Sequence, residues 1–274
     1  MIKRTLSAVI GIPIFIFIVY RGGNLLLLSI IIVTMTAIDE YIRSFEKSIE
    51  NINEKKELYY YRIWLWFSTL LSYAVFYYTD FKIEFEAPFI FVVILGIAFI
   101  EIIHPTYETK RSRDMIYGYI YITVFFRFVY YTAQIENGFW VWLIFLIAWS
   151  TDTFAYFTGL LLGRNKLAPE ISPKKTIEGA IGGVLGSALC TFAYATVFIP
   201  QMSSVSIIFG VLGSIVSQIG DLNASIIKRR NGVKDFGNLI PGHGGILDRF
   251  DSILFTAPFV YVLYIFLHGM GVIR

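Results

Sequence analysis

The sequence contains little charge and almost no cysteine. Only 16% of its 274 residues are charged, and it has one cysteine and three histidines. A single cysteine excludes disulfide bonds and cysteine-based zinc sites within one chain. We interpret Cys190, which lies in an apolar segment, as a buried structural thiol. We also find no Ser-His-Asp or Cys-His arrangement of the kind that nucleophilic catalysis uses.

Apolar residues dominate the composition. Hydrophobic residues make up 56% and aromatic residues 18% of the chain, and the mean hydropathy is +0.65. These values lie outside the range of an ordinary soluble domain and indicate a chain embedded in a bilayer. Apolar runs close to the ~20 residues that span a bilayer predict an all-α, polytopic integral membrane protein. About nine transmembrane helices are expected, centred on residues 5–20, 24–41, 63–79, 84–103, 115–135, 139–163, 178–200, 205–227 and 252–270.

The distribution of basic residues predicts the topology. Nearly all of the 23 Lys and Arg residues fall at the N-terminus or in the loops 42–62, 104–114, 164–177 and 228–251. Because basic residues collect on the cytoplasmic side, we expect a cytoplasmic N-terminus and a multi-pass protein of the cytoplasmic (inner) membrane. No small-x-small cleavage pattern follows Tyr20, so we expect the first span to be uncleaved.

The spans divide into two groups by their motifs. Residues 1–135 are recognised only as about five apolar N-terminal spans, and residues 136–274 contain the expected catalytic spans with the two cytoplasmic motif loops. We find no internal repeat and no soluble domain. The chain is therefore predicted to be one helical unit whose chemistry lies in its C-terminal half.

Charged residues inside spans are costly, at ~2.5–3.5 kcal/mol each near a helix centre, so each one needs an explanation. We expect interfacial roles for the residues near span ends, namely Asp39, Glu40, Glu101 and Glu178. Arg127 is expected to pair with a carboxylate or to reach the interface, and the sequence does not choose its partner. Asp152 and Asp221 remain as functional candidates.

A polar stripe precedes the longest C-terminal loop. In a helix over residues 205–229, the spacing of Asp221, Ser225, Lys228 and Arg229 places these side chains along one face. The stripe predicts either a polar helix interface or one side of a charged cavity.

The next loop combines glycines with carboxylates. The run Pro241-Gly242-His243-Gly244-Gly245 allows positive φ angles and close approach of backbone N–H groups to an anion. Asp248 and Asp251 follow at a spacing of three, on one face of the last helix. Hard cations such as Mg²⁺ take oxygen ligands, so Asp221, Asp248 and Asp251 are candidate metal ligands.

A second polar segment links two earlier spans. Asp152 lies inside one span, and Lys174 and Lys175 precede a helix that Thr176 is expected to cap near Glu178. Cations are unfavourable at a helix N-terminus unless an anion is bound there, and a phosphate is one such anion. The spacing of Gly179, Gly182, Gly183 and Gly186 predicts close helix packing.

These motifs resemble the signature of the phosphatidate cytidylyltransferases, also called CDP-diacylglycerol synthases. The resemblance rests on Ser225, Lys228 and Arg229, then Lys234 and Asp235, then the run from Pro241 through Asp248 and Arg249 to Asp251. The segments around Asp152 and from Ser172 to Gly183 are similar to a second block of the family. The family often has an acidic residue immediately before the motif serine, where this chain has Ala224.

The resemblance implies a divalent-metal-dependent reaction of CTP with phosphatidate that gives CDP-diacylglycerol and pyrophosphate. Mg²⁺, with a second cation possible, is the implied cofactor, and a homodimer is possible; no nucleic acid is involved. We expect an active site on the cytoplasmic face that opens to the inner leaflet. The expected metal ligands are Asp221, Asp248, Asp251 and Asp152. The expected catalytic residues are Asp221, Asp248, Lys228 and Arg229. The expected substrate-binding residues are Ser225, Lys174, Lys175, Lys234, Asp235, His243, Gly244, Gly245 and Arg249.

Two other functions fit parts of the pattern. A CTP-dependent polyprenol or lipid kinase has a similar membrane architecture, but its lipid hydroxyl attacks the γ-phosphate and it releases CDP. An ion-coupled transporter could use Asp152, Arg127 and Asp221 as an ion path. The transporter predicts charges spread through the membrane depth, whereas here they gather at one face.

Overall fold

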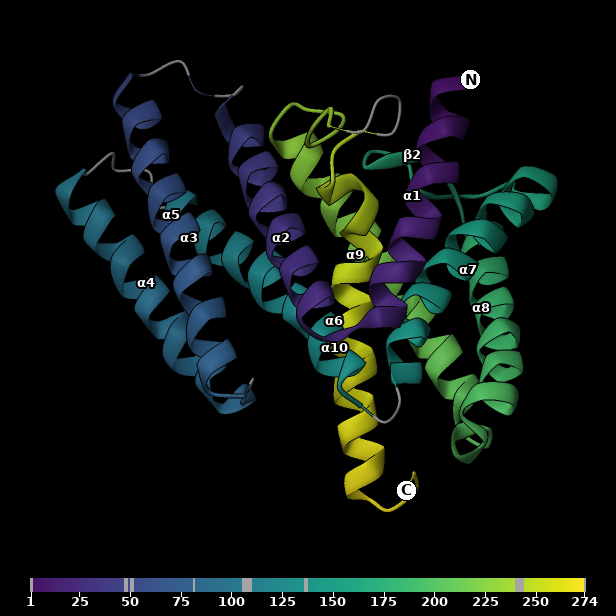
Figure 1. Ribbon diagram of the computed structural model, residues 1–274. Helices are drawn as coiled ribbons and strands as arrows, with labels where there is room; N and C mark the ends of the chain where they lie inside the picture. The colour runs from purple at the N-terminus through teal and green to yellow at the C-terminus, as the bar shows by residue number, and fades with distance from the viewer. Residues whose placement is uncertain are drawn as a thin grey trace. The chain divides into compact units, whose positions relative to one another are not determined.

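The computed structural model describes residues 2–46, 49, 52–80, 82–104, 110–135, 138–239 and 244–273. Helices make up nearly all of the regular structure in these residues (Figure 1). They are α1 (Ile2–Arg21), α2 (Gly23–Glu46), α3 (Ile52–Tyr78), η1 (Ile83–Phe85), α4 (Glu86–Ile103), α5 (Lys110–Gly118), η2 (Tyr119–Val124), α6 (Phe125–Ala133), α7 (Phe139–Leu162), α8 (Ile177–Phe198), η4 (Pro200–Met202), α9 (Ser206–Arg230) and α10 (Leu247–Gly269).

The predicted apolar spans all fall on helical segments. The fifth span corresponds to the continuous run α5, η2 and α6, in which η2 is a π-helical stretch. Within the described residues, six helices are long and apolar enough to cross a membrane: α2, η1 with α4, α7, α8, α9 and α10. The prediction of an all-α, polytopic membrane protein is confirmed, while nine crossings and a cytoplasmic N-terminus stay predictions.

The predicted loop 164–177 contains two short strands. Strands β1 (Lys166–Ala168) and β2 (Ser172–Thr176) form an antiparallel hairpin that connects α7 to α8. The backbone N–H of Ile171 donates to the carbonyl of Ala168 at 3.2 Å and closes the turn. A two-stranded hairpin has only edge strands, which tolerate a proline such as Pro173 because its missing N–H need not pair.

The chain divides into two compact units. The N-terminal unit consists of Met1–Arg127 and Arg230–Arg249, and the C-terminal unit consists of Phe128–Arg229 and Phe250–Arg274. The segment after α9 groups with the first spans. The reason is that Arg230 donates to Asp114 on α5 at 3.1 Å and Asn231 donates to Ser44 on α2 at 2.7 Å. The predicted division into N-terminal spans and C-terminal catalytic spans stays a prediction.

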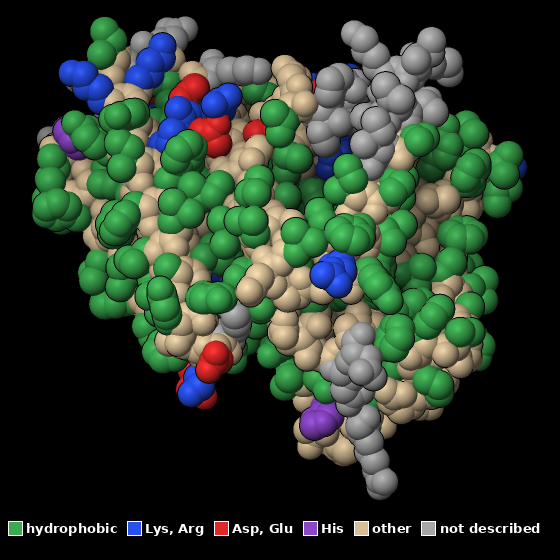
Figure 2. Space-filling view, viewed as in Figure 1, with side chains coloured by type: hydrophobic (Ala, Val, Ile, Leu, Met, Phe, Trp, Pro, Cys, Tyr) green, Lys and Arg blue, Asp and Glu red, His purple; other side chains and the backbone are tan. Residues whose placement is uncertain are grey.

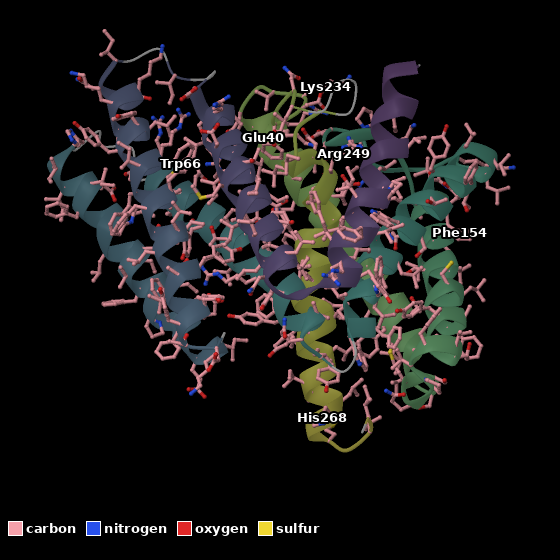
Figure 3. The ribbon with its side chains drawn as sticks, in the orientation of Figure 1. Glu40, Trp66, Phe154, Lys234, Arg249 and His268 are labelled. Carbon is pink, nitrogen blue, oxygen red and sulfur yellow. The ribbon has the colours of Figure 1, made fainter. Side chains whose placement is uncertain are left out.

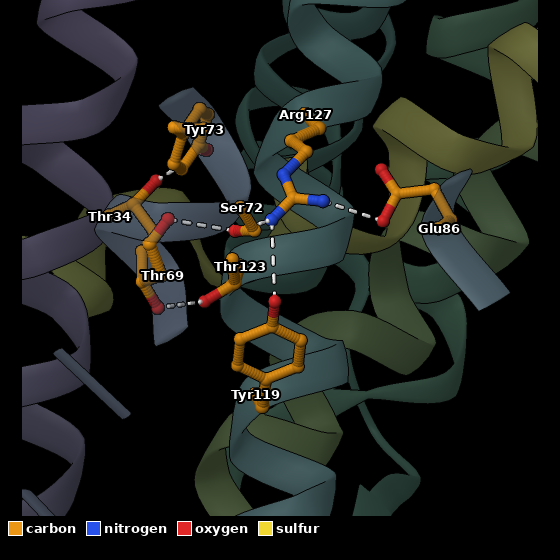
Figure 4. A network of polar contacts seen from close by, with 8 residues as sticks. All are labelled: Thr34, Thr69, Ser72, Tyr73, Glu86, Tyr119, Thr123 and Arg127. Atoms are coloured by element: carbon orange, nitrogen blue, oxygen red, sulfur yellow. Dashed lines mark hydrogen bonds and ion pairs between the residues drawn. The ribbon is translucent and has the colours of Figure 1, made fainter. Parts of the chain in front are cut away.

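The N-terminal unit contains a buried ion pair. Arg127, which is 2% exposed, donates to Glu86 Oε2 at 2.6 Å and also to Ser72 Oγ and, at 3.4 Å, to Tyr119 Oη (Figure 4). Its guanidinium group also lies over the rings of two aromatic residues of α3. The partner that the sequence left open is therefore Glu86, at the start of α4.

Hydroxyl pairs extend this network between helices. The hydroxyl oxygens of Thr34 on α2 and Tyr73 on α3 are hydrogen-bonded at 3.1 Å. Those of Thr69 on α3 and Thr123 in η2 are hydrogen-bonded at the same distance (Figure 4). All four side chains are buried. Because an unsatisfied polar group costs several kcal/mol in hydrocarbon, these pairs favour one register of the helices.

The surface of the N-terminal unit separates apolar from charged side chains. Figure 2 shows hydrophobic side chains over the viewed sides of α3 and α4, with charged side chains at both ends of these helices and the larger group at the upper end in this view. Near the start of α3, Arg62 Nη2 lies 2.5 Å from Glu46 Oε1, and Arg111 Nη2 lies 2.9 Å from Glu54 Oε2. Apolar sides between charged ends suit helices that stand in a membrane.

The C-terminal unit packs α7 tightly against α8. A Cβ on Gly179 would lie 2.8 Å from the carbonyl oxygen of Ala155, and one on Gly183 would lie 3.0 Å from that of Thr151. A Cβ on Gly182 or Gly186 would also strike side chains of α7. The predicted packing role of these glycines is confirmed, because only residues without a side chain permit this approach.

Candidate active site

The β hairpin is joined rigidly to α8. Thr176 ends β2 and caps α8, since its hydroxyl accepts a hydrogen bond from the N–H of Gly179 at 3.1 Å. This cap confirms the predicted helix start. Glu178 accepts hydrogen bonds from the backbone N–H groups of Arg164 at 3.0 Å and Asn165 at 3.2 Å, so it fastens the other end of the hairpin. Lys174 and Lys175 are thereby held just ahead of α8.

A cavity of about 450 Å³ lies within the C-terminal unit. It is lined by residues of α7, the hairpin, α8 and α9, namely Asp152, Ala155, Tyr156, Gly159, Leu160, Leu167, Lys174, Lys175, Thr176, Gly179, Ala180, Gln218 and Asp221. The structure therefore brings Asp152, Asp221, Lys174 and Lys175 to the lining of one cavity, where Lys175 forms an ion pair with Asp221. A cavity with both charges can hold an anion against the lysines and a cation against the aspartates.

Two ion pairs connect the elements around α9. Lys175 binds Asp221, and Lys228 Nζ lies 4.0 Å from Asp251 Oδ2 on α10. Asp251 is also within electrostatic reach of Asp221 and Asp152. The sequence predicted an anion beside Lys174 and Lys175 at the N-terminus of α8. In the structure, the carboxylate of Asp221 is an anion bound to Lys175.

Small residues allow α9 and α10 to approach each other at this point. A Cβ on Gly220 would lie 2.8 Å from the carbonyl oxygen of Asp251. Gln218 donates to the carbonyl of Ala180 on α8 at 3.2 Å, which fixes α9 against the cavity wall. The glycine beside Asp221 therefore lets the backbone of Asp251 pack directly against α9.

The residues of the predicted polar stripe on α9 differ in their exposure. Ser225 and Lys228 are each 8% exposed, and Asp221 is partly buried. Arg229, in contrast, is exposed. Ala224, where the resembled family often has an acidic residue, is fully buried and offers no ligand oxygen. Of the stripe, Asp221 is the residue that lines the cavity.

The described part of the glycine-rich segment is held by carboxylates of the N-terminal unit. Asp248 is 8% exposed, and its Oδ2 accepts hydrogen bonds from the N–H groups of Phe236 at 2.9 Å and Gly245 at 3.0 Å. Gly244 has φ +84, as the sequence predicted for this turn. The N–H of Gly245 therefore already binds an anion, and that anion is a side chain of the protein.

Glu40 holds the next two N–H groups. Its Oε1 accepts from Ile246 at 3.0 Å and its Oε2 from Leu247 at 2.9 Å. Beyond the interfacial role expected for it, Glu40 is a buried structural contact, because the residue is 6% exposed and bonds to the start of α10. Its partners lie more than 200 positions away in the sequence, so no local pattern could reveal them.

The other predicted site residues are less constrained. Lys234, Asp235 and Arg249 are exposed members of the N-terminal unit. Figure 3 shows Lys234 and Arg249 near the same end of that unit as Glu40. His243 lies outside the described residues, as do Pro241 and Gly242.

The donor chemistry of the C-terminal unit fits a hard divalent cation. Asp152, Asp221 and Asp251 offer carboxylate oxygens, the ligands that Mg²⁺ prefers. Among the residues that the structure describes, no three His, Cys, Asp or Glu side chains converge closely enough to form a metal cluster. Mg²⁺ does not require such a cage, because it usually takes one or two protein carboxylates together with water and substrate phosphates.

Sequence reasoning missed one residue of these arrangements and the partners of another. Gln218 lines the cavity and lies three positions before Asp221 on α9, a spacing that puts both side chains on one helix face. Glu40 was singled out as a costly carboxylate in an apolar span, but its bonds to Ile246 and Leu247 were not foreseen.

The helices and the charged cavity define a membrane protein suited to a phosphate-bearing substrate. Comparison with known proteins makes this class more specific. The chain belongs to the cytidylyltransferase family, whose model matches residues 2–267.

Several similar proteins are named phosphatidate cytidylyltransferase. The chain is 32% identical over 264 residues to the phosphatidate cytidylyltransferase of Bacillus subtilis, which covers 95% of this chain and 96% of that protein. It is 34% identical over 273 residues to that of Staphylococcus aureus, with 96% and 98% covered. It is 38% identical over 176 residues to that of Thermotoga maritima, an alignment that covers 61% of this chain and 64% of the relative.

Proposed function

We propose that the protein transfers the cytidylyl group of CTP to phosphatidate and forms CDP-diacylglycerol and pyrophosphate in phospholipid biosynthesis. The observation that carries this proposal is the cavity in which Asp152 and Asp221 meet Lys174 and Lys175. Support also comes from relatives named phosphatidate cytidylyltransferase that align along nearly the whole chain.

The reaction needs charge stabilisation more than a strong base. A phosphate oxygen of phosphatidate attacks the α-phosphorus of CTP, and the bond from that phosphorus to the bridging oxygen of the β-phosphate breaks. Pyrophosphate leaves with the electron pair. Because the second pKa of a phosphate monoester is about 6, the attacking oxygen is already anionic near neutral pH. Lys174 and Lys175 can stabilise the phosphate charges, and the cavity walls can align the reactants.

A divalent cation completes the proposed chemistry. When bound, Mg²⁺ would neutralise charge on the nucleotide phosphates. Asp221 and Asp152 are the proposed ligands in the cavity, with Asp251 supporting them. Lys175 balances the charge of Asp221 in the structure, so we expect nucleotide and metal to rearrange this pair. Removing divalent ions with EDTA should abolish turnover, and adding excess Mg²⁺ should restore it.

The proposed location is the cytoplasmic membrane, with the active site open to the cytoplasm and the inner leaflet. The one-sided distribution of Lys and Arg in the loops supports this orientation. A lipid with two acyl chains can then stay in hydrocarbon while its phosphate meets a nucleotide from water. A homodimer is compatible with the exposed apolar helices, and light scattering of the detergent-solubilised protein would test it.

Two labelled nucleotides test the reaction directly. Purified protein is incubated with phosphatidate, Mg²⁺ and CTP that carries radioactive phosphorus in either the α or the γ position. The proposal predicts that the α label enters the lipid extract and the γ label leaves as pyrophosphate. A lipid kinase would give the opposite pattern when supplied with a polyprenol. Absence of α label from the lipid extract of a folded preparation, supplied with phosphatidate, CTP and Mg²⁺, would reject the proposed function.

A further inference from the structure

The N-terminal spans take part in building the motif that follows α9. Three residues near the end of α2 contact this segment: Glu40 accepts from Ile246 and Leu247, Tyr41 packs its ring 6.4 Å from that of Phe236, and Ser44 accepts from Asn231. Glu40, Tyr41 and Ser44 recur at a spacing that places them on adjoining parts of one helix surface. One surface of α2 therefore holds several points of the motif segment.

Glu40 makes the most specific of these contacts. One carboxylate oxygen binds the N–H of Ile246, the residue just before α10, at 3.0 Å, and the other binds the N–H of Leu247, the first residue of α10, at 2.9 Å. The first N–H groups of a helix have no partner within the helix, and a negative charge is favourable beside them. Glu40 satisfies two N–H groups at this end from a different helix, so it fixes where α10 begins.

The surrounding glycines leave room for this carboxylate. A Cβ on Gly237 or Gly245 would collide with the carboxylate group of Glu40. Gly245 also donates its N–H to Asp248. Two buried carboxylates therefore hold the backbone here: Asp248 binds the N–H groups of Phe236 and Gly245, and Glu40 binds those of Ile246 and Leu247.

We propose that Glu40 is a positioning residue for the cytidylyl transfer reaction. By fixing the first turn of α10, it sets the direction of Asp248 and, one helical turn further along, of Asp251. It also sets the position of the exposed Arg249, which Figure 3 shows near the same end of the unit. Glu40 touches no reacting atom in this account, and it acts through the backbone that carries those residues. The proposal rests on the proposed function.

Glu40→Gln is the main test. Glutamine keeps the size of the side chain but replaces one acceptor oxygen with an NH₂ group, which would face a backbone N–H. We expect kcat/KM for CTP to fall at least about tenfold, equivalent to about 1.4 kcal/mol, with a raised KM for CTP. A smaller folded fraction would lower the maximal rate without changing KM. Glu40→Asp keeps both acceptors on a shorter chain and should recover part of the loss.

Asp39→Asn is the matched control. Asp39 is the neighbouring carboxylate on α2, but it pairs with Arg43 at 2.6 Å and Arg62 at 3.4 Å. It should retain kcat/KM and KM close to those of the wild type. Equal loss in Asp39→Asn and Glu40→Gln would overturn the proposal, because it would show a general need for charge on α2.

Hydrogen exchange gives a readout that is independent of turnover. In Glu40→Gln, the amides of Ile246 and Leu247 should exchange faster in peptides that cover residues 244–250, while Asp39→Asn leaves them unchanged. Unchanged exchange in Glu40→Gln would overturn the proposed contact. A wild-type enzyme that forms no CDP-diacylglycerol would reject the function instead, whereas an active wild type with a fully active Glu40→Gln would reject the positioning role alone.

Gly237→Ala tests the same contact from the opposite side. Its new methyl group would press on the carboxylate of Glu40, so kcat/KM should fall. In the Glu40→Asp background the shorter side chain leaves space, and the same alanine should cost less. Equal costs in both backgrounds would contradict the proposed packing of Gly237 against Glu40.

Discussion

Both units contain an ion pair between side chains of different elements, but the surroundings of the two pairs differ. In the N-terminal unit, the side chains of Arg127 and Glu86 are 3% and 10% exposed and belong to a closed network of hydroxyl groups. In the C-terminal unit, the side chains of Lys175 and Asp221 are 27% and 26% exposed and line a cavity. The same kind of pair can therefore stabilise helix packing in one place and remain accessible to a substrate in the other.

This comparison predicts that the first pair matters for folding and the second for turnover. A buried pair that loses one partner leaves an uncompensated charge in low dielectric. A pair at a cavity can exchange its partner for a phosphate or a cation with little change in burial. Substitutions in the two units should therefore separate stability from activity.

The largest effect is expected for Arg127→Met. It leaves Glu86 charged and buried, so the free energy of unfolding should fall by about 3–5 kcal/mol. Thermal unfolding in detergent measures the loss, and the KM values of the remaining folded enzyme should not change. The double variant Arg127→Met with Glu86→Gln should recover much of the stability. An Arg127→Met protein with the unfolding temperature of the wild type but without activity would contradict the assignment of this pair to stability.

Asp221→Asn should have the opposite profile. It keeps the shape of the side chain but removes a charge from the cavity, so CDP-diacylglycerol formation should fall about 10²–10³-fold, the range seen when one electrostatic contact to a transition state is lost. The unfolding temperature should stay close to that of the wild type. Near-normal rates in a folded variant would remove Asp221 from the proposed site.

Lys174→Ala sharpens the comparison within the hairpin. Lys174 lines the cavity, whereas Lys166 on the neighbouring strand is exposed and is not among the lining residues. Losing one charge-assisted contact of about 1.5 kcal/mol should raise KM for CTP roughly tenfold. Lys166→Ala, as the control, should leave KM unchanged. Equal effects of the two substitutions would indicate nonspecific attraction of the nucleotide to a basic surface.

The smallest effect is expected at the cap of α8. Thr176→Ala removes the hydrogen bond to the N–H of Gly179 and should cost about 1 kcal/mol of stability. Thr176→Ser keeps the hydroxyl and should restore most of it, as measured by thermal unfolding. A loss of turnover in Thr176→Ala at full stability would show that the hydroxyl itself contacts a substrate.

Local patterns in the sequence were sufficient to predict much of this arrangement. Apolar runs predicted the helices, the spacing of Gly179 and Gly183 predicted close packing, and Thr176 predicted the start of α8. These features depend on residues that are near in sequence. The residue types of Lys174 and Asp221 also predicted phosphate chemistry, although the sequence does not show that the two residues line one cavity.

Contacts between distant segments could not be predicted in this way. Glu86 and Arg127 are 41 positions apart, and Glu40 and Leu247 are 207 apart. Several carboxylates and cations were available, and periodicity within one helix does not select a partner on another. The short hairpin was missed because its strands are too brief to show a clear alternating pattern.

The most direct test of the central claim asks whether CTP enters the cavity of the C-terminal unit. A single cysteine is placed at the cavity in Tyr156→Cys, or on β1 as a control in Lys166→Cys, each with Cys190→Ser to remove the native thiol. The rate of reaction with a water-soluble thiol reagent is then measured with and without CTP and Mg²⁺. The account predicts several-fold slower labelling at position 156 and no change at position 166. Equal labelling rates at position 156 with and without saturating CTP would contradict it.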